Sequence, residues 1–308
     1  MKFVAINKAK TKSGTNPPNS RDYKTFHKIA DALAPEFEKR IKTSLDEFRD
    51  LVDLRDLLTA IATGDEEKIM GTIPWKEFLS NDEDLHDAII EAVKEAGVAS
   101  KAQLKAMLER TGRDTETYAS FSGSDPRVVR YARKRTAFLI TEVTESSKEA
   151  VRQAIGDLNE GTDDPRSVAQ RIQDAVGLDT RRANAVDRYR DALEQAGVPD
   201  DRIDRRAEAY RDRLLAQRAD TIARTESINA VNAGQQEGWD QAADRGEIDR
   251  KTAKKVWIVT PDDRLCPRCE ELAGQAVGID EQFDTDEGRI DGPGLHPNCR
   301  CSMALVLE

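Results

Sequence analysis

Apolar residues recur at steps of three and four along most of the chain, which is the spacing of one face of an amphipathic helix. The first such run predicts a helical stretch from about residue 22 to Gly64. Pro35 is expected to kink or split this helix, because proline lacks the backbone N–H and its ring clashes with the preceding turn. Two further runs predict separate helices that end at Gly97 and Gly112.

A second helical block begins at Asp125-Pro126, a capping residue followed by proline at the first helical position. Asp164-Pro165 repeats this signal, and Asp179 is expected to cap the helix after that. From Asp200 to about Ala243 the apolar spacing predicts one long helix. Together these runs predict a mainly α protein with an elongated helical body.

The pattern changes after Gly246. Residues 256–260 are β-branched and aromatic and predict a short strand, and residues 302–307 predict a closing strand. Glycines punctuate the sequence between them. The C-terminal part is therefore expected to be a small α+β, loop-rich module attached to the helical body.

Length and charge divide the chain further. Its 308 residues favour about two domains, and we expect a flexible basic arm (1–20), an N-terminal helical domain (21–120), a second helical part (121–246) and the module (247–308). The arm carries four lysines and no acid, whereas residues 257–308 carry 4 basic and 11 acidic groups. The sequence contains no run of about 18 apolar residues and no secretory signal, so neither a membrane span nor secretion is predicted.

All four cysteines lie in the last 43 residues, with one of the three histidines among them. Cys266-Pro-Arg-Cys269 and His296-Pro-Asn-Cys299 are two donor pairs, each with an i, i+3 spacing. Two such pairs supply the four donors of a tetrahedral Zn²⁺ site. We expect Cys266, Cys269, His296 and Cys299 to bind a structural zinc ion, with Cys301 as the alternative fourth ligand.

Other interpretations of these cysteines stay open. They could form two disulfides or remain reduced thiols, and redox chemistry of the C-x-x-C pair is a weaker alternative because no βαβ context surrounds it. A catalytic zinc is not predicted, because neither H-E-x-x-H nor a deaminase pattern is present. The acidity of residues 257–308 disfavours a nucleic-acid zinc finger.

Outside this cluster the sequence offers few candidates. His27 and His86 lie on charged helices and are expected to be solvated. Arg224 and Glu226 diverge on the long helix, so each would reach a separate partner. We expect them to be structural residues that tie the helix to the module, which must then fold back along it.

Several of these residues carry a resemblance to a known family. The ordered set begins at Arg224-Thr225-Glu226 and ends at the motif His296-Pro-Asn-Cys-Arg-Cys301; between them lie Asn232-Ala233-Gly234, Trp239, Lys255-Val256-Trp257, Asp262–Cys269 and Leu272-Ala273-Gly274. It resembles the C-terminal domain of the phage Mu F-like minor head proteins, the head-morphogenesis family of tailed bacteriophages. The acidic loop from Gly278 to Gly292 departs from the family's pattern.

The resemblance implies a minor capsid protein, not an enzyme, that binds the portal protein and acts in head assembly and in DNA packaging or ejection. It implies a place in the virion head near the portal vertex, and in the host cytoplasm during assembly. Major capsid or scaffold protein and packaged DNA are further expected contacts, and no membrane contact is expected. Two other classes stay open, a nucleic-acid-binding protein with a zinc module and an enzyme or toxin that carries this domain.

Overall fold

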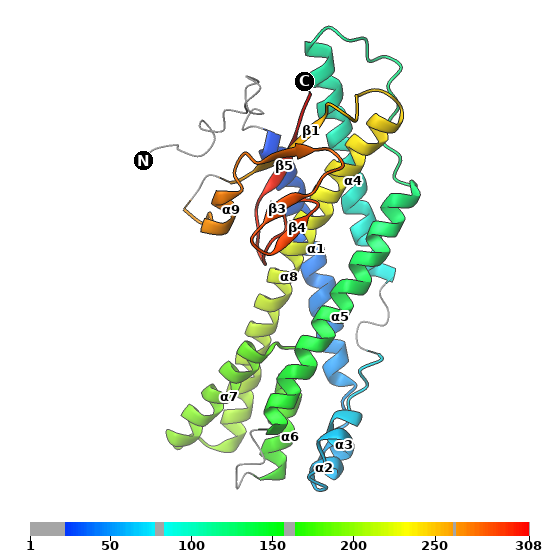
Figure 1. The fold of residues 1–308 in the computed structure, drawn as a ribbon. Coiled ribbons are helices and arrows are strands. Elements are labelled where there is room, and N and C mark those ends of the chain that lie inside the picture. Colours follow the sequence, from blue (N-terminus) through cyan, green and yellow to red (C-terminus); the bar gives the residue numbers. More distant parts are fainter. Residues whose placement is uncertain (1–21, 78–82, 157–163, 261–262, 308) are drawn as a thin grey trace. The chain divides into compact units, whose positions relative to one another are not determined.

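The computed structural model describes residues 22–77, 83–156, 164–260 and 263–307 (Figure 1). The predicted basic arm, residues 1–20, lies outside the described residues. Helices dominate the described part of the chain, and short antiparallel strands are confined to its C-terminal part. The mainly α class with an α+β C-terminal module is therefore confirmed. None of the helices in the described ranges is long and apolar enough to cross a bilayer.

The helices of the described residues fall into a first group and a second group along the chain. The first group is α1 Asp22–Asp50, α2 Leu54–Ile61, α3 Glu66–Gly71 and α4 Glu83–Arg110. The second group is α5 Pro126–Gly156, α6 Pro165–Ala175, α7 Thr180–Gln195 and α8 Asp200–Asp244. The predicted helix starts are confirmed at residues 126, 165, 180 and 200.

Two predicted helix breaks are wrong. Helix α1 continues through Pro35, which lies on the exposed side of the helix, where water can solvate the carbonyl that loses its N–H partner. Helix α4 continues through Gly97, where the sequence predicted an end. A Cβ atom at Gly97 would lie 2.3 Å from the Phe121 ring. The absence of a side chain at Gly97 therefore lets this ring pack directly against the backbone of α4.

Aspartates begin several helices as predicted. The side chain of Asp164 accepts a hydrogen bond from the Arg166 backbone N–H, and that of Asp179 accepts one from the Arg182 N–H. Asp53 and Asp65 cap α2 and α3 in the same way. These caps satisfy donors that the first helical turn leaves without a partner.

The described residues separate into two compact units, each built from separated segments. One unit contains the described residues up to Phe37, then His86–Arg133 and the chain from Thr221 onward; the other contains Glu38–Leu85 and Lys134–Asp220. The division at residues 20, 120 and 246 that the sequence suggested runs along the chain and stays a prediction.

The C-terminal module belongs wholly to the first unit. Its three-stranded antiparallel sheet has the order β2 Ala276–Gly278, β1 Lys254–Ile258 and β5 Ser302–Val306, and a hairpin pairs β3 Phe283–Thr285 with β4 Gly288–Ile290. A short helix, α9 Pro267–Glu271, follows β1. The fully buried Trp257 on β1 meets Phe283 edge to face, with ring centroids 5.2 Å apart.

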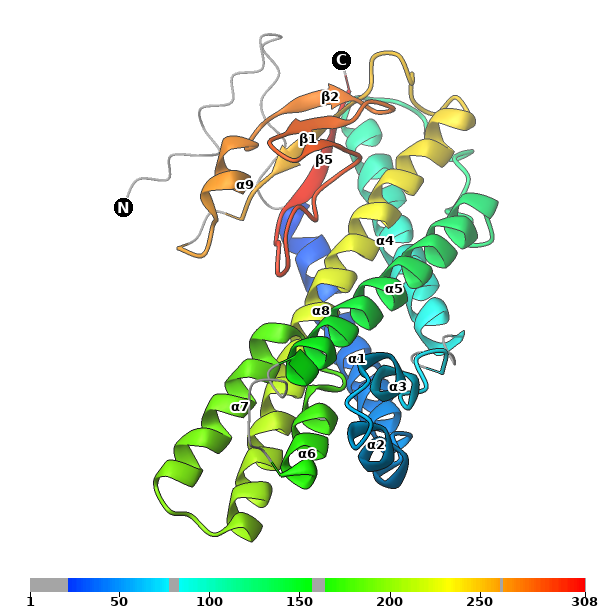
Figure 2. The ribbon, with the colours of Figure 1, turned by 60° about the horizontal axis from the view of Figure 1, so that its bottom comes forward.

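The module shares its hydrophobic core with α8 and α4. Trp239 of α8 and Leu104 and Leu108 of α4 belong to the same buried cluster as Trp257 and Phe283. Figure 2 shows the sheet beside the C-terminal half of α8. The module therefore forms one continuous core with these two helices.

Candidate metal centre

The first donor pair stands at the start of α9. Cys266 is the N-cap residue, with extended backbone, and Pro267 occupies the first helical position. The Cys269 backbone N–H donates a hydrogen bond of 3.3 Å to Cys266 Sγ. Capping and proline thus fix a turn that points both sulfur atoms the same way.

The second donor pair stands on a tight turn before β5. The Cys299 N–H donates to the His296 carbonyl at 3.1 Å. Asn298 has a φ of 59°, the left-handed conformation that asparagine tolerates better than most residues. This turn brings His296 and Cys299 to one side, toward α9.

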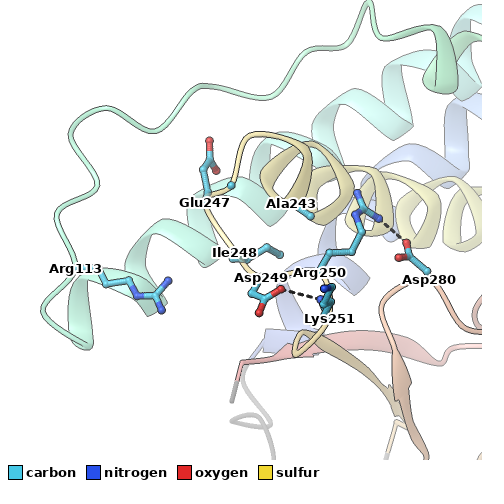
Figure 3. Close-up of a pocket in the computed structure, with 9 residues that line it drawn as sticks. Arg113, Ala243, Glu247, Ile248, Asp249, Arg250, Lys251 and Asp280 are labelled. Carbon is cyan, nitrogen blue, oxygen red and sulfur yellow. Dashed lines mark hydrogen bonds and ion pairs between the residues drawn. The ribbon is translucent and has the colours of Figure 1, made fainter.

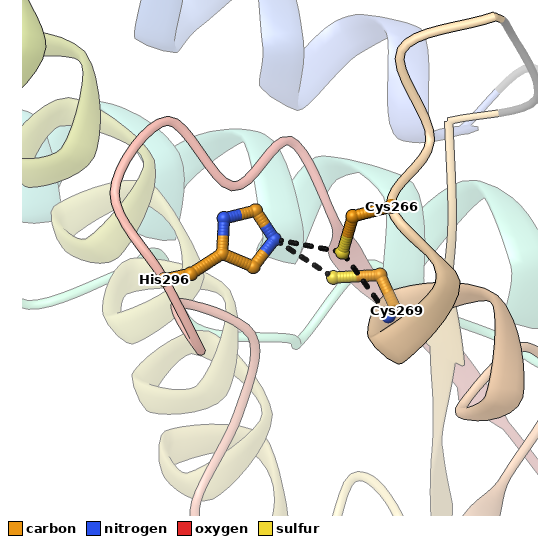
Figure 4. Close-up of side chains that lie close together, drawn as sticks. All are labelled: Cys266, Cys269 and His296. Atoms are coloured by element: carbon orange, nitrogen blue, oxygen red, sulfur yellow. Dashed lines mark hydrogen bonds between the residues drawn. The ribbon is translucent and has the colours of Figure 1, made fainter.

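The first pair meets His296 of the second pair in space (Figure 4). His296 Nε2 lies 3.1 Å from Cys266 Sγ and 3.2 Å from Cys269 Sγ, and Cys269 Sγ lies 3.9 Å from Cys299 Sγ. No disulfide joins any of the four cysteines. Three of the four predicted ligands thus lie together, with Cys299 beside Cys269, although the two pairs are 26 residues apart in sequence.

Cys301, the residue directly before β5, lies in the same cluster. The donors form two overlapping triads that share Cys269, namely Cys266–Cys269–His296 and Cys269–Cys299–Cys301, with ligand atoms within 4.8 Å of one another in each. Both Cys299 and Cys301 are buried. The structure therefore keeps Cys301 as the alternative fourth ligand.

The thiols perturb one another strongly. Hydrogen bonds from Cys269 and Cys301 lower the pKa of Cys299, whereas the hydrogen bond to Cys299 raises the pKa of Cys269. Proximity to Cys299 and burial raise the pKa of Cys301 to about 12, although a hydrogen bond with Cys269 opposes the shift.

The histidine is presented in the form that a metal needs. His296 Nδ1 lies 2.9 Å from the Pro297 carbonyl oxygen, so the proton belongs on Nδ1 and the lone pair of Nε2 faces the sulfur atoms. Metal-bound histidines commonly have such a second hydrogen bond.

The donor spacing fits a zinc ion. Zn–S bonds of about 2.3 Å at tetrahedral angles place two sulfur atoms about 3.8 Å apart, close to the 3.9 Å between Cys269 and Cys299. The sulfur and nitrogen donors are those that Zn²⁺ prefers. The cluster could thus hold a metal ion, as the sequence predicted.

The second turn is fastened to α8. The backbone N–H of Asn298 donates to Thr225 Oγ1 at 3.0 Å, across 73 residues of sequence. Asn232 Nδ2 donates to the Pro293 and Cys301 carbonyls, each at 3.3 Å, and Gln235 Nε2 donates to the Met303 carbonyl at 3.0 Å. The C-terminal module therefore folds back along α8, as the sequence analysis required.

Arg224 and Glu226 were predicted to tie α8 to the module. They flank Thr225, which accepts the hydrogen bond from Asn298. Arg224 is exposed on α8 and Glu226 is buried; their bracing role stays a prediction. Sequence reasoning missed Thr225, Asn232 and Gln235. An available signal was the recurrence of uncharged polar residues on an otherwise apolar helix face.

His27 departs from its prediction. Instead of being solvated, it is largely buried on α1, with Nε2 3.4 Å from Thr260 Oγ1, whose hydroxyl donates to the Arg300 carbonyl at 2.7 Å. Burial lowers the pKa of His27, and a hydrogen bond with the Arg300 backbone opposes that shift. His86 is only 23% exposed. Both histidines are less solvated than expected.

A second feature of this unit is an open pocket of about 660 Å³ beside the end of α8 (Figure 3). Arg250 lines it and bridges the carboxylates of Asp240 and Asp244, at 3.0 and 2.8 Å, and that of Asp280. Because Arg250 forms ion pairs with three carboxylates, its positive charge is already neutralised within the protein.

Comparison with known proteins assigns the C-terminal part of the chain. Residues 187–304 match the family model described as phage Mu protein F like protein. This range contains all of α8, most of the sheet and every predicted metal ligand. The resemblance drawn from the motifs is therefore confirmed for residues 187–304, which are similar to the phage Mu F-like head-morphogenesis family.

One curated relative shows a partial likeness. It is the NAD(+)–arginine ADP-ribosyltransferase EFV of Enterococcus faecalis, 30% identical over 93 residues. The match covers 28% of this chain and 18% of the relative, so the chain spans about a fifth of that protein's length. No solved structure matches the chain.

Proposed function

We propose that this chain is a minor capsid protein of a tailed bacteriophage that binds the portal protein and acts in head assembly and in DNA packaging or ejection. The observation that carries the proposal is the family match over 187–304, which unites α8 with the module docked on it. In this proposal the protein resides in the virion head near the portal vertex and has no catalytic turnover. The helical body supplies the portal contact.

Co-expression with the portal protein encoded beside it tests this proposal. The two proteins should co-purify, and a truncation that removes residues 1–20 should co-purify equally well. A portal protein from an unrelated phage is the control for nonspecific association. Failure of the pair to associate, both in solution and in assembled heads, would contradict the proposal.

Within this proposal Cys266, Cys269, His296 and Cys299 hold one structural zinc ion, with Cys301 as the alternative to Cys299. The ion would tie α9 to the turn before β5. The module is short and shares its core with α8, so metal binding would contribute to its folding free energy. Cys266→Ser should release the metal and unfold the module while most of the helical circular dichroism remains.

Arg224 and Glu226 are proposed to brace α8 against the module. Arg224→Ala should lower thermal stability or incorporation into heads while zinc content stays near one per chain. Unchanged stability together with unchanged incorporation would leave Arg224 as ordinary surface charge. The neighbouring Thr225 contact with Asn298 supports an attachment at this level of the helix.

The partial likeness to an ADP-ribosyltransferase favours one alternative, an enzyme or toxin that carries the same domain. The match covers only 18% of that relative, and our proposal expects no transferase activity in this chain. Incubation with labelled NAD and an arginine-rich acceptor should give no labelled product. Transfer of label to the acceptor would establish the enzyme instead.

A further inference from the structure

Helix α7 and the first half of α8 lie side by side within the second unit (Figures 1 and 2). Tyr189 of α7 and Tyr210 of α8 contact each other, with ring centroids 5.0 Å apart. The Arg213 guanidinium lies over the Tyr210 ring at 5.0 Å. Both tyrosines are partly exposed, so this contact marks a surface that the two helices share.

Four acidic residues of α8 share another face of that helix and are paired with arginines. On α8, residues 201, 204, 208 and 212 repeat at steps of three and four, which places them on one face. Their carboxylates pair with arginines, as do those of α7 that face α6. The pairs are Arg205–Asp201, Arg190–Asp204, Arg49–Glu208, Arg211–Asp212 and Arg171–Asp191.

The arginines on the tyrosine side have no such partners. Arg202, Arg206 and Arg213 follow one face of α8 at steps of four and seven, next to Tyr210. Arg181 and Arg188 are two turns apart and share one face of α7, and Arg188 directly precedes Tyr189. All five are exposed, and among the residues that the structure describes no carboxylate forms an ion pair with any of them. We call these five residues and the two tyrosines the arginine face.

We propose that the arginine face binds the phosphate backbone of double-stranded DNA. The family assignment concerns head morphogenesis and names no such surface on α7 and α8. The proposal rests on the proposed function only in taking DNA from the phage head as the natural ligand. It also assigns DNA contact to these two helices and not to the acidic Cys/His module, whose net charge would repel phosphate.

The chemistry of the face matches a polyanion. Arginine is charged at every physiological pH, and its planar fork donates two parallel hydrogen bonds to a phosphate. Tyrosine hydroxyls are also common donors to DNA phosphates. From Arg202 to Arg213 the row extends about 16 Å along α8 at 1.5 Å per residue. Duplex DNA presents one charge per about 1.7 Å of axis, so one row can meet several phosphates.

An acidic protein is the competing occupant, and the salt dependence of binding separates the two. Each arginine that neutralises a DNA phosphate contributes about −0.9 to the slope of log K against log salt concentration. At 0.1 M salt this corresponds to about an eightfold loss of affinity for each arginine removed. A protein partner releases no such condensed counterion layer.

The test is a fluorescence anisotropy titration of a labelled 30-base-pair duplex with the purified full-length protein between 50 and 300 mM salt. The double variant Arg206→Ala/Arg213→Ala should bind about 60-fold more weakly at 0.1 M salt, with a slope shallower by about 1.8. Arg181→Ala/Arg188→Ala should behave similarly. The matched control is Arg152→Ala, an exposed arginine of α5 that pairs with Glu149, and this variant should bind like the wild type.

Wild-type affinity and slope in both double variants would overturn the proposal, as would an equal loss in Arg152→Ala. Competition by polyglutamate as strong as by unlabelled duplex would assign the face to an acidic protein instead. Circular dichroism and thermal melting of each variant check that the helices remain. Because this titration needs no portal protein, its failure beside successful portal co-purification would remove the DNA site alone.

Discussion

Asp187 on α7 is a carboxyl group in an unfavourable place. Burial raises its pKa to about 6, and the nearby Arg171 only partly opposes the shift. The unfolded chain would release this proton near pH 4, so between pH 4 and 6 the folded state binds more protons than the unfolded state. The contribution of Asp187 to stability is therefore greatest below pH 4 and is lost as the pH rises through 6.

Asp187→Asn removes this ionisation. The variant should be more stable than the wild type at pH 7.5 by about 2–3 kcal/mol, from about 1.4 kcal/mol per unit of pKa shift. The advantage should shrink toward pH 4, where the wild-type carboxyl is protonated. Urea unfolding of both proteins from pH 4 to 8 measures the difference. An advantage that does not depend on pH would contradict the assignment.

Thr225 is the residue of α8 that receives the Asn298 N–H from the turn between the metal donors. Thr225→Val keeps the shape and removes the acceptor, so the module should become less stable by about 0.5–1.5 kcal/mol. Amide hydrogen exchange should show lower protection in residues 293–301 than in the wild type. Thr225→Ser, which keeps the hydroxyl, should restore protection. Equal protection in all three proteins would show that this hydrogen bond does not hold the turn.

The residues of the candidate site differ in how readily the sequence revealed them. Cysteines and histidine at i, i+3 spacing identify themselves, because few other arrangements need those residue types together. Thr225 and Asn232 do not, because a polar residue on a helix is usually solvated. Their partners are backbone groups 61 to 73 residues away, and no local pattern encodes such a contact.

At the scale of elements, Gly234 sets how closely α8 approaches α4. A Cβ atom there would lie 2.4 Å from the Val93 carbonyl oxygen and 2.7 Å from Ala96 Cβ. Gly234→Ala should therefore force the helices apart in the first unit and destabilise the protein by about 1–3 kcal/mol. The gain in helix propensity, about 1 kcal/mol, does not offset this.

Gly71→Ala is the matched control, because Gly71 also belongs to a helix, as the last residue of α3. The added Cβ would have no atom within 4 Å, and the residue needs no positive φ. It should be neutral or slightly stabilising in a thermal melt. If Gly234→Ala melts at the wild-type temperature or above it, the close approach of α4 and α8 in the described structure is wrong.

The helix starts and the helix end near Gly112 could be predicted from the sequence, whereas the helices continue through Pro35 and Gly97, where the sequence predicted breaks. Asp164-Pro165 and Asp179 act through hydrogen bonds two or three residues away, so the local sequence contains the whole cause. Gly97 signals a helix end by its intrinsic propensity. In the fold it instead makes room for Phe121, a tertiary contact that outweighs propensity. The fold class was thus readable, whereas the path of α4 was not.

At the scale of the whole molecule, the net charge does not show where the charges of each sign lie. The chain has a net charge of −10, yet the arginine face carries five exposed arginines without acidic partners. A count along residues 121–256 finds 25 basic and 25 acidic groups and suggests no such surface. Only the helical arrangement of α7 and α8 separates the paired charges from the unpaired ones.

The central claim is that a metal ion joins the start of α9 to the turn before β5. The most direct test is the zinc content of the full-length protein, purified under reducing conditions and measured by elemental analysis against protein concentration. The account predicts about one tightly bound zinc ion per chain, which Cys266→Ser loses. Protein that is folded in its C-terminal module yet holds no stoichiometric metal would contradict the account.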